Sequence, residues 1–600
     1  MVKIFENAEY NVLPISEFKL FSDFGDWQFP PADSEQGKAL LALADEALEK
    51  EIPQLYATKF LEFTRIGNRA NFEADYFERR TMLFRLLMGE LILDSGKYVD
   101  KIIDIVWLIL EETTWHIPAH NNDGSGNPHI THQPLGYQYE GKVSDVDLFS
   151  AETSSLMAFV HYFLCDKLDA VTPIIGERMV YEIRRRGIKP YIDRCDQLWR
   201  GYNKAKKPNN WNPWIAANVL TSTALVESEL SVRKKIVALA MESMDLFLDE
   251  YPEDGGCDEG PAYWSYAGGS LFMALEVIYD MTAGTGNFFD KEIVYNIFDY
   301  IRKVHLREYM YTNFADCGVN LYTEGMHFVV RMGERTGNKA LTAFALANSK
   351  CNCVPSGNRH VYRNLKDICY KLPEFEDYMP NKFDRLKNLQ VAVYRNVDGF
   401  TLAAKGGHNK ESHNHNDVGQ FILMNEEKPV IIDIGAPTYT RDVFSENRYK
   451  VFPINGTWHS VPIVNGYAQK EGPQYACDRF LASEDKITIE YQSAYEKEAG
   501  IKKCLREIIL GKDEIIINES IDFDGNEAIF QYYMLDAPEK KEGNTFFFAN
   551  GVKITAPEGS EVIPVSVPDK KVADSWGTDT LHKIVVKIDK SGSFSLKFTR

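Results

Sequence analysis

The sequence lacks any apolar run long enough to cross a membrane, which takes about 20 consecutive apolar residues. Its first residues, MVKIFENAEYNVLPISEF, contain no apolar core of the length that a signal peptide needs. We therefore expect a cytoplasmic protein that does not enter a membrane.

Cysteine is sparse and forms no framework. The 600 residues include nine cysteines, an odd number, scattered without the regular spacing of a disulfide-rich domain. Disulfides persist in oxidising compartments, whereas isolated thiols stay reduced in a cytoplasm. The cysteines therefore agree with a cytoplasmic location and predict no cross-links.

Positive charge is also in deficit, with 67 Lys and Arg against 87 Asp and Glu and a net charge of −20. A surface of that sign repels nucleic acid and anionic membranes, so both are excluded as general partners. An acidic substrate is not excluded, because a few cationic side chains can form a local binding site within an acidic protein. A homo-oligomer stays open.

Chain length and hydrophobic periodicity divide the sequence. At 600 residues it exceeds one ordinary core, so two or three domains are expected. Between about 35 and 380 the apolar residues recur at helical spacing, as in GKALLALADEALEKEI, with short turns between helices. From about 390 the period changes to two, as in DEIIINESIDF. We predict a multidomain α+β protein: an N-terminal extension (1–34) packing on an (α/α) toroid of helical hairpins (35–380), followed by an antiparallel β-sandwich (381–600).

The stretch ESHNHNDVGQF in the predicted β-domain places His413 and His415 two residues apart. Asp433 lies in the apolar stretch KPVIIDIGAPTY, where a carboxylate is costly unless it is paired or holds a metal. His459 lies in INGTWHSVPIVNG, just before another apolar strand. Two imidazoles and a carboxylate are a suitable set for zinc, with water or another group completing the tetrahedron. A proton-transfer site and hydrogen-bonded polar residues lining a turn fit the same spacing.

Two segments of the helical half are rich in polar and aromatic side chains. In KKPNNWNPWIAANVL, three asparagines and two tryptophans lie at a predicted helix start: Asn209, Asn210, Asn212, Trp211 and Trp214. Asparagine is common at N-caps, but three within four residues beside tryptophans favour a sugar-binding wall. In DGGCDEGPAYWSYAGG, a glycine-rich turn precedes Tyr263, Trp264 and Tyr266. A tyrosine in such a place is either a packed residue with a satisfied hydroxyl or a functional group.

The segments SHNHNDVGQFIL, PVIIDIGAPTYT and GTWHSVPIVNG together resemble the signature of the heparinase II/III family of polysaccharide lyases. The resemblance extends over nearly the whole chain and is strongest between 408 and 466. In that family a helical toroid precedes a β-sandwich, which is the order expected here. The resemblance implies that His415, Asp433 and His459 bind zinc in a structural role and that His413 faces the substrate cleft. An ideal strand would point both histidines the same way, so these two directions imply an irregular backbone.

The family cleaves glycans beside a uronic acid by β-elimination, and its E-G-x-x-Y segment, which carries the catalytic tyrosine, falls on Glu259–Tyr263 here. The resemblance implies that Tyr263 and His413 are the base and the acid, in an order that depends on syn or anti elimination. It also places Tyr439 among the catalytic residues near the cleft.

The uronate carboxylate must be neutralised before its neighbouring carbon can lose a proton. Asn210, with Asn209 or Asn212, is the expected clamp, because amide N–H groups stabilise the developing enediolate. Some members of the family carry a histidine in the segment that reads NNWNPW here, so this segment supplies donors but no cation. The other residues expected to contact substrate are Trp115, His116, His120, Trp211, Glu259, Trp264, Asn313 and Asp316.

Three other functions are open on the sequence. The first is zinc-dependent hydrolysis, with His413, His415 and Asp433 holding a catalytic metal. The second is glycoside hydrolysis by paired carboxylates, for which Asp258, Glu259 and Asp316 are the candidates. The third is a glycan-binding protein of the same fold without activity. The polymer is not readable from the sequence, and the expectation of a cytoplasmic protein favours exo-acting cleavage of imported oligosaccharides.

Overall fold

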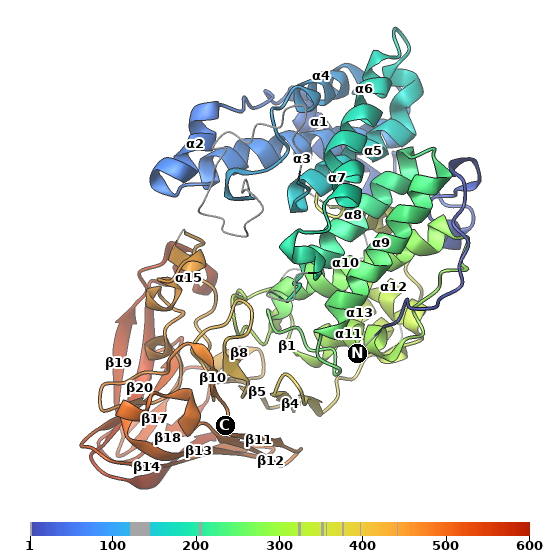
Figure 1. Cartoon of the computed structure of the whole chain (residues 1–600). Coiled ribbons are helices and arrows are strands. Elements are labelled where there is room, and N and C mark those ends of the chain that lie inside the picture. The colour runs from blue at the N-terminus through green and yellow to red at the C-terminus, as the bar shows by residue number, and fades with distance from the viewer. Residues whose placement is uncertain are drawn as a thin grey trace. The chain divides into compact units, whose positions relative to one another are not determined.

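The computed structural model describes residues 3–120, 145–202, 207–321, 326–349, 353–355, 357–374, 377–396, 398–440 and 442–600. Two compact units divide the chain (Figure 1). The helical unit comprises Met1–Tyr251, Ser265–Phe298 and Thr323–Asp377, and the β unit comprises Pro252–Trp264, Asp299–Tyr322 and Tyr378–Arg600. Two segments that precede the sandwich strands in sequence therefore belong to the β unit. The domain boundaries predicted from the sequence stay predictions.

Helices account for most of the first 370 residues. They are α1 (Glu35–Glu49), α2 (Ala57–Ile66), α3 (Ala70–Leu93), α4 (Val99–Leu110), α5 (Leu148–Leu168), α6 (Ile174–Ile183), α7 (Lys189–Asp193), α8 (Trp211–Val226), α9 (Leu230–Asp249), α10 (Pro261–Met281), α11 (Glu292–Lys303), α12 (His327–Thr336), α13 (Lys339–Ala347) and α14 (Val361–Cys369). Among the described residues, no helix combines the length and apolar character of a membrane span.

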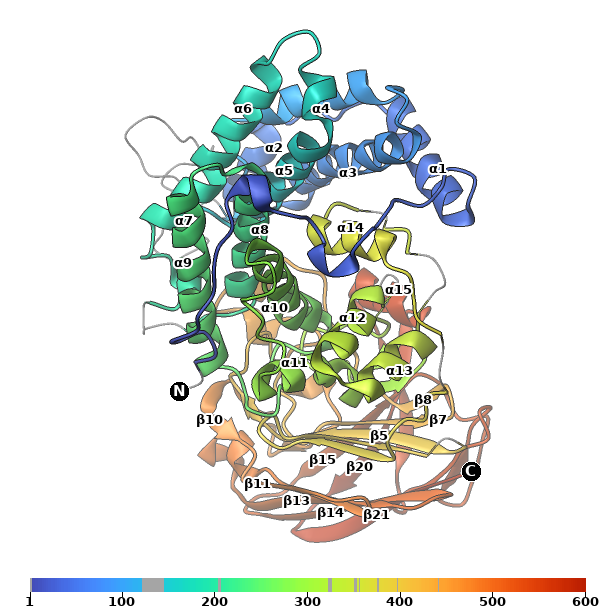
Figure 2. The same ribbon diagram turned by 90° about the vertical axis from the view of Figure 1, so that its right-hand side faces the viewer.

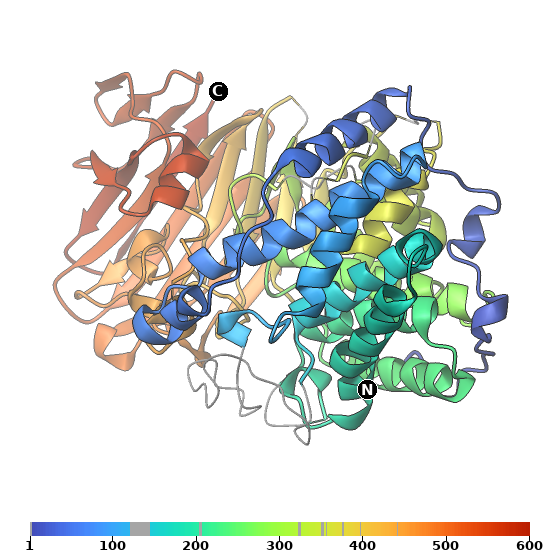
Figure 3. The ribbon, with the colours of Figure 1, turned by 90° about the horizontal axis from the view of Figure 1, so that it is seen from above.

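These helices pack largely in pairs. α1 lies against α3, α5 against α6 and α8, α8 against α9, and α12 against α13. Figure 3 shows the first pair among the blue helices. α8 is buried along almost its whole length and α5 is buried from Leu148 to Val160, so both contribute to the interior of the helical unit. α3 ends at Leu93, and Asp94 adopts a left-handed conformation (φ 49°) that stops the helix.

Residues 3–34 pack on the helical unit. Asp280 of α10 accepts hydrogen bonds from the backbone N–H groups of Phe21 (2.9 Å) and Ser22 (3.0 Å). Arg233 of α9 donates to the carbonyl of Leu13 (2.9 Å). Asp280 therefore anchors this segment, whose few regular turns could not fold alone.

The β unit contains an eight-stranded, a five-stranded and a four-stranded sheet and two strand pairs, all antiparallel among the described residues. The eight-stranded sheet has the order β11 (Arg479–Ala482), β12 (Lys486–Glu490), β13 (Ile501–Leu510), β14 (Glu514–Phe523), β21 (Gly592–Thr599), β18 (Lys553–Thr555), β17 (Thr545–Phe547), β16 (Lys540–Glu542). The five-stranded sheet has the order β3 (Phe383–Leu386), β4 (Val391–Arg395), β5 (Phe400–Lys405), β7 (Phe421–Asn425), β8 (Lys428–Ile431). The four-stranded sheet has the order β19 (Glu561–Ser566), β20 (Thr580–Ile588), β15 (Ala528–Met534), β9 (Ile463–Val464). β10 (Gly472–Ala476) pairs with β6 (His408–Asn409), and β1 (His305–Arg307) with β2 (Met310–Tyr311). The short helix α15 (Lys570–Trp576) follows β19.

Side chains from the three larger sheets form a hydrophobic core, and a second, smaller cluster includes Ile432, Tyr533 and Leu581. Figure 2 shows β5 and β7 in one layer and β13, β14 and β21 in the next. β13 and β14 alternate between buried and more exposed residues, which is the period of two seen in the sequence, whereas β4, β5 and β7 are buried on both faces. The predicted fold class, paired helices followed by an antiparallel sandwich, is confirmed.

Candidate active site

Two irregular segments of the β unit position the candidate site. In the first, Gly260 precedes α10 with φ +87°, and a Cβ there would lie 2.8 Å from the carbonyl oxygen of Phe314. Only glycine allows this close approach, which brings Glu259 and Tyr263 beside the segment that carries Asp316. In the second, His413 itself adopts a left-handed conformation (φ 55°) between β6 and β7. The backbone is therefore irregular at this histidine, as the resemblance implied. Both histidines bond to Asp316, but the ring of His413 lies on Tyr263 and that of His415 lies beside His459.

Asp316 lies at the centre of the site. Its carboxylate accepts hydrogen bonds from His413 Nδ1 (2.9 Å), His415 Nε2 (3.1 Å), Arg448 Nη2 (3.0 Å) and the Tyr439 hydroxyl (3.1 Å). Burial by itself would raise the pKa of Asp316, but the two histidines and the Arg448 charge hold that pKa well below its usual range. The side chain is fully buried and holds its four donors in place, and the predicted substrate contact stays a prediction.

His413 lies between two carboxylates. Its Nδ1 bonds to Asp316, and its Nε2 lies 3.4 Å from Glu259 Oε2. Burial lowers the pKa of His413, but the Asp316 hydrogen bond and the Glu259 charge outweigh burial and raise it. The imidazole stacks on the ring of Tyr263, with centroids 4.2 Å apart and planes 22° apart. With 20% of its side chain exposed, His413 is the histidine of this group that a ligand can reach.

A tyrosine pair extends this network. The hydroxyls of Tyr263 and Tyr439 are 2.7 Å apart, and Tyr439 donates its own proton to Asp316. An ionised carboxylate can only accept, so Tyr263 donates to Tyr439 in this arrangement. Burial and the charge of Asp316 raise the pKa of Tyr439 far above its ordinary value, which keeps that hydroxyl protonated. Tyr263 is thus the end of a hydrogen-bonded chain that runs through Tyr439 to Asp316.

His415, Asp433 and His459 form a buried cluster whose possible ligand atoms lie within 4.8 Å of one another. His415 Nδ1 and His459 Nε2 have no hydrogen-bond partner among the described residues. The other nitrogen of each imidazole bonds to a carboxylate: His415 Nε2 to Asp316, and His459 Nδ1 to Asp433 Oδ2 (3.2 Å). Asp316 behind His415 is typical of a zinc site, because such a carboxylate fixes the tautomer and leaves Nδ1 for the metal, whereas Asp433 lies beside His459 Nδ1 as a fellow ligand candidate. The residues therefore fit a zinc ion.

Several predicted substrate contacts are buried in this structure. Asn212 is fully buried, and its amide donates to Ser243 Oγ (2.8 Å) and to the Trp199 carbonyl (3.0 Å). Trp115 and Trp264 are 1% and 0% exposed. Their contacts in this structure are with other protein groups, and the prediction that they contact substrate stays a prediction.

Two further predicted contacts are held in place by backbone carbonyls. His116 is 5% exposed and its Nε2 lies 3.1 Å from the Asp145 carbonyl oxygen. Asn313 is 3% exposed and donates to the Asp433 carbonyl (2.9 Å), so it supports the metal cluster rather than a sugar.

The asparagine segment lies in the helical unit. α8 begins at Trp211, and Asn210, at its N-cap, makes no side-chain capping bond and is 3% exposed. Asn209 accepts from the backbone of Trp211 (3.3 Å). Trp211 and His120 are partly exposed, with ring centroids 4.6 Å apart. The catalytic and binding roles of these residues stay predictions.

Arg448 belongs to the site although no motif in the sequence marks it. It lies in a short 3-10 turn (Arg448–Lys450) and also donates to the Asn414 carbonyl (3.0 Å). Its 132-residue separation from Asp316 explains why a search along the sequence misses it.

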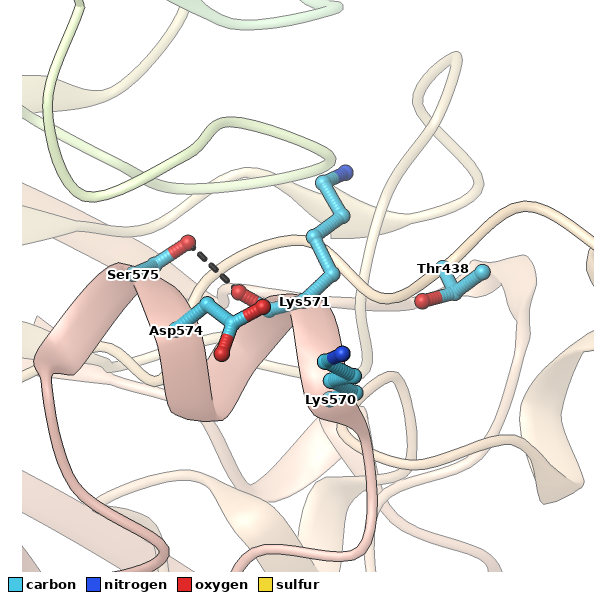
Figure 4. A pocket seen from close by; sticks show the side chains of 5 residues that line it. All are labelled: Thr438, Lys570, Lys571, Asp574 and Ser575. Atoms are coloured by element: carbon cyan, nitrogen blue, oxygen red, sulfur yellow. Dashed lines mark hydrogen bonds between the residues drawn. The ribbon is translucent and has the colours of Figure 1, made fainter.

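An open pocket lies beside the segment that carries Tyr439. It is lined by Thr438, Lys570, Lys571, Asp574 and Ser575 (Figure 4). The ammonium of Lys571 lies 5.3 Å from the ring centroid of Tyr439 and donates to the Pro437 carbonyl (3.1 Å). The pocket therefore carries both charges: Lys570 and Lys571 line it together with Asp574, and Thr438 donates to Asp569.

No family model matches the chain, and no curated protein matches it. Several solved structures, in contrast, are similar to this chain. Heparinase III is 13% identical and matches with a TM-score of 0.62 over 99% of this chain and 87% of its own. A heparan sulfate lyase from Pedobacter heparinus is 12% identical, with a TM-score of 0.56 over 96% and 86%. This chain has a polysaccharide lyase fold. A chondroitin AC lyase from Streptomyces coelicolor A3, in complex with chondroitin sulphate, is also similar, at 9% identity and a TM-score of 0.52 over 95% and 80%. At these identities the likeness shows the fold, which is the one that the sequence resemblance implied.

Proposed function

We propose that this protein is a lyase that cleaves a uronic-acid-containing glycan by β-elimination and leaves an unsaturated uronide. The observation that carries the proposal is the stacked contact of Tyr263 and His413, both joined to the buried Asp316. Two groups able to transfer protons lie side by side, and each has a hydrogen-bonded partner that fixes its orientation. The lyase fold supports the same reaction class.

Elimination needs a base for the C5 proton and an acid for the departing glycosidic oxygen. We assign these two roles to Tyr263 and His413. The configuration of the sugar at C5 decides which residue takes which role, because syn and anti elimination place the base on different faces of the ring. Two further residues orient this pair: Tyr439 hydrogen-bonds to the Tyr263 hydroxyl, and Asp316 hydrogen-bonds to the His413 ring.

The substrate carboxylate requires donors as negative charge develops on it. We assign this role to Asn210, with Asn209 as its neighbour. Asn212 is fully buried and its amide already donates to Ser243 Oγ. The proposed substrates are acidic oligosaccharides cleaved from one end, which agrees with the expectation of imported fragments.

A zinc ion held by His415, Asp433 and His459 would supply a fixed positive charge and a cross-link within the β unit. His415 and His413 share Asp316, so the metal site would also fix the backbone that carries His413. We therefore propose a structural zinc.

The two hydrolytic alternatives fit the geometry less well. Zinc hydrolysis through His413, His415 and Asp433 requires His413 as a ligand, yet its two nitrogens face Asp316 and Glu259. Hydrolysis by paired carboxylates requires the ionised carboxylate to reach the substrate or its attacking water, yet the Asp316 carboxylate is fully buried and already accepts from four donors.

The decisive test is incubation with a panel of uronic-acid oligosaccharides while recording the ultraviolet absorbance of a new C4–C5 double bond. We expect absorbance to rise with at least one substrate. New reducing ends without absorbance would instead indicate a hydrolase, and binding without any product would indicate a glycan-binding protein.

The residues are tested with the substrate that this panel identifies. Tyr263→Phe and His413→Ala should each lower kcat by at least about 100-fold, because general acid–base groups contribute about 10²–10⁴-fold. Tyr467→Phe, an exposed tyrosine of the same unit, is the matched control and should leave kcat unchanged. Near-normal rates in either site variant would remove that residue from the mechanism.

A further inference from the structure

The helical unit contains a group of ring contacts that the proposed proton transfer does not use. We define the aromatic–arginine cluster as His120, Phe149, Trp211, Trp214, Tyr266 and Arg359. Its members come from α5, α8, α10, the turn at His120 and the segment before α14.

The contacts within the cluster are continuous. His120 stacks on Phe149 at 5.2 Å and 8°, and lies 4.6 Å from the ring of Trp211. Trp214 contacts Phe149 edge-on at 6.2 Å and stacks on Tyr266 at 4.4 Å and 9°. Packing fixes every ring, so the cluster is organised in advance of any ligand.

Arg359 is the unusual member because it is exposed and, although the charges of Glu152 and Glu73 act on it, no carboxylate among the described residues forms an ion pair with it. Its guanidinium lies over the rings of Phe77 (5.1 Å) and Phe149 (5.5 Å) and donates one hydrogen bond, to the Tyr266 hydroxyl (3.3 Å). It forms no ion pair within the part of the chain that the structure describes. Guanidinium has five N–H donors in a planar fork, so most of its donors are available to a ligand.

Arg178 of α6 provides the contrast. Its guanidinium also lies 5.1 Å from a ring centroid, that of Trp107, but it is paired with the carboxylate of Glu111 (2.6 Å). An arginine that is held on aromatic faces without an anion is therefore not a general feature of this chain's surface.

Buried polar atoms without partners lie in the same cluster. Glu152 Oε1 accepts from Trp214 Nε1 (2.8 Å), but Glu152 Oε2 has no partner among the described residues. The two ring nitrogens of His360 also have no hydrogen-bond partner among the described residues. The centroid of this ring lies 5.1 Å from that of Trp214 and 5.5 Å from that of Tyr266. Both side chains are 2% exposed. Polar atoms buried in this way are satisfied by water or by a ligand's hydroxyl groups.

We propose that the aromatic–arginine cluster binds a sugar residue that carries an anionic group, either a carboxylate or a sulfate. The apolar C–H face of a pyranose packs on the partly exposed rings of Trp211 and Tyr266, while the oxyanion accepts N–H groups of Arg359. The inference rests on the proposed function only in taking the ligand to be a glycan. Arg359 itself is outside the residues that transfer protons.

The test is titration calorimetry in the Tyr263→Phe background, so that turnover does not consume the ligand. The probes are an unsulfated disaccharide of glucuronic acid, its sulfated counterpart and a neutral disaccharide. We expect the parent to bind at least one acidic probe, and Arg359→Ala to weaken that binding by about tenfold or more, because charge-assisted hydrogen bonds are lost. Arg359→Lys should recover part of the affinity, since it keeps the charge but not the fork.

Arg178→Ala is the matched control and should bind as the parent does. Selective loss of the sulfated probe in Arg359→Ala assigns the contact to sulfate, and loss of both acidic probes assigns it to the carboxylate. Equal affinity in Arg359→Ala and the parent, equal weakening for the neutral probe, or no binding of any probe by the parent would each overturn the proposal. The outcome is independent of the lyase assignment, because Arg359-dependent binding is measured even if no probe is ever cleaved.

Discussion

At the scale of single residues, Asp316 decides how the site is arranged. One buried carboxylate accepts from His413, His415, Arg448 and Tyr439, so it joins the proton-transfer pair to the possible zinc ligands. A carboxylate is needed because all four partners are donors. The sequence predicted Asp316 as a sugar contact, and the structure places it as a fully buried acceptor.

Asp316→Asn tests this arrangement. An amide accepts through one oxygen only and turns its NH2 group toward a donor, so some partners lose their acceptor. We expect kcat to fall about 10- to 100-fold, as for residues that orient metal ligands, with KM within about threefold and with less bound zinc. Steady-state kinetics and elemental analysis measure these quantities.

The matched control is Asp384→Asn, which breaks the buried pair of Asp384 with Arg395 (2.7 Å) in the same unit. It should lower stability without lowering zinc content. Wild-type kcat and zinc in Asp316→Asn would show that the four hydrogen bonds do not matter for function.

At the scale of elements, burial decides which polar contacts join the helices. α5 and α8 are interior helices, and Trp214 of α8 donates to Glu152 of α5. Burial raises the pKa of Glu152 from 4.5 to about 7, although the charge of Arg359 and the Trp214 hydrogen bond oppose it. The native state therefore holds this proton more tightly than the unfolded chain does.

The sign of the pH dependence follows from that shift. The stabilisation from protonated Glu152 is complete below about pH 4.5 and is lost as the pH rises through about 7, for a total of up to roughly 3 kcal/mol. We expect Glu152→Gln to flatten the decline in the free energy of unfolding between pH 5 and pH 8. Urea unfolding followed by tryptophan fluorescence measures it.

Glu177→Gln, an exposed carboxylate on α6, is the control and should leave the pH slope as it is in the wild type. A slope that is the same in Glu152→Gln and in the wild type would contradict the raised pKa.

At the scale of the whole molecule, two compact units have separate interiors, and the possible zinc ligands all belong to the β unit. A metal that binds only the folded β unit stabilises that unit by mass action. Two units with separate cores need not unfold in one transition. Metal removal should therefore act on one part of the unfolding profile.

We expect calorimetry to resolve two transitions, and chelation or His459→Ala to lower only one of them, by about 5 °C or more, with loss of bound zinc. His582→Ala, a histidine of the β unit bonded to the Leu535 carbonyl, is the control and should keep both zinc and transition temperatures. An unchanged metal content in His459→Ala would refute the ligand set.

The sequence by itself determined the order and kind of the elements, because a period of 3.6 or of two residues is a local property of the chain. It also identified His413, His415, Asp433, His459 and Tyr263 through short motifs. Only the tertiary structure decided that Asp316 is a shared acceptor, that Arg448 joins it, and that Asn212, Trp115 and Trp264 are interior residues. Asp316 and His413 are 97 residues apart, and nothing in either neighbourhood specifies the other. Folding creates such contacts by closing long loops, so burial and partners are properties of the folded chain and not of its local patterns.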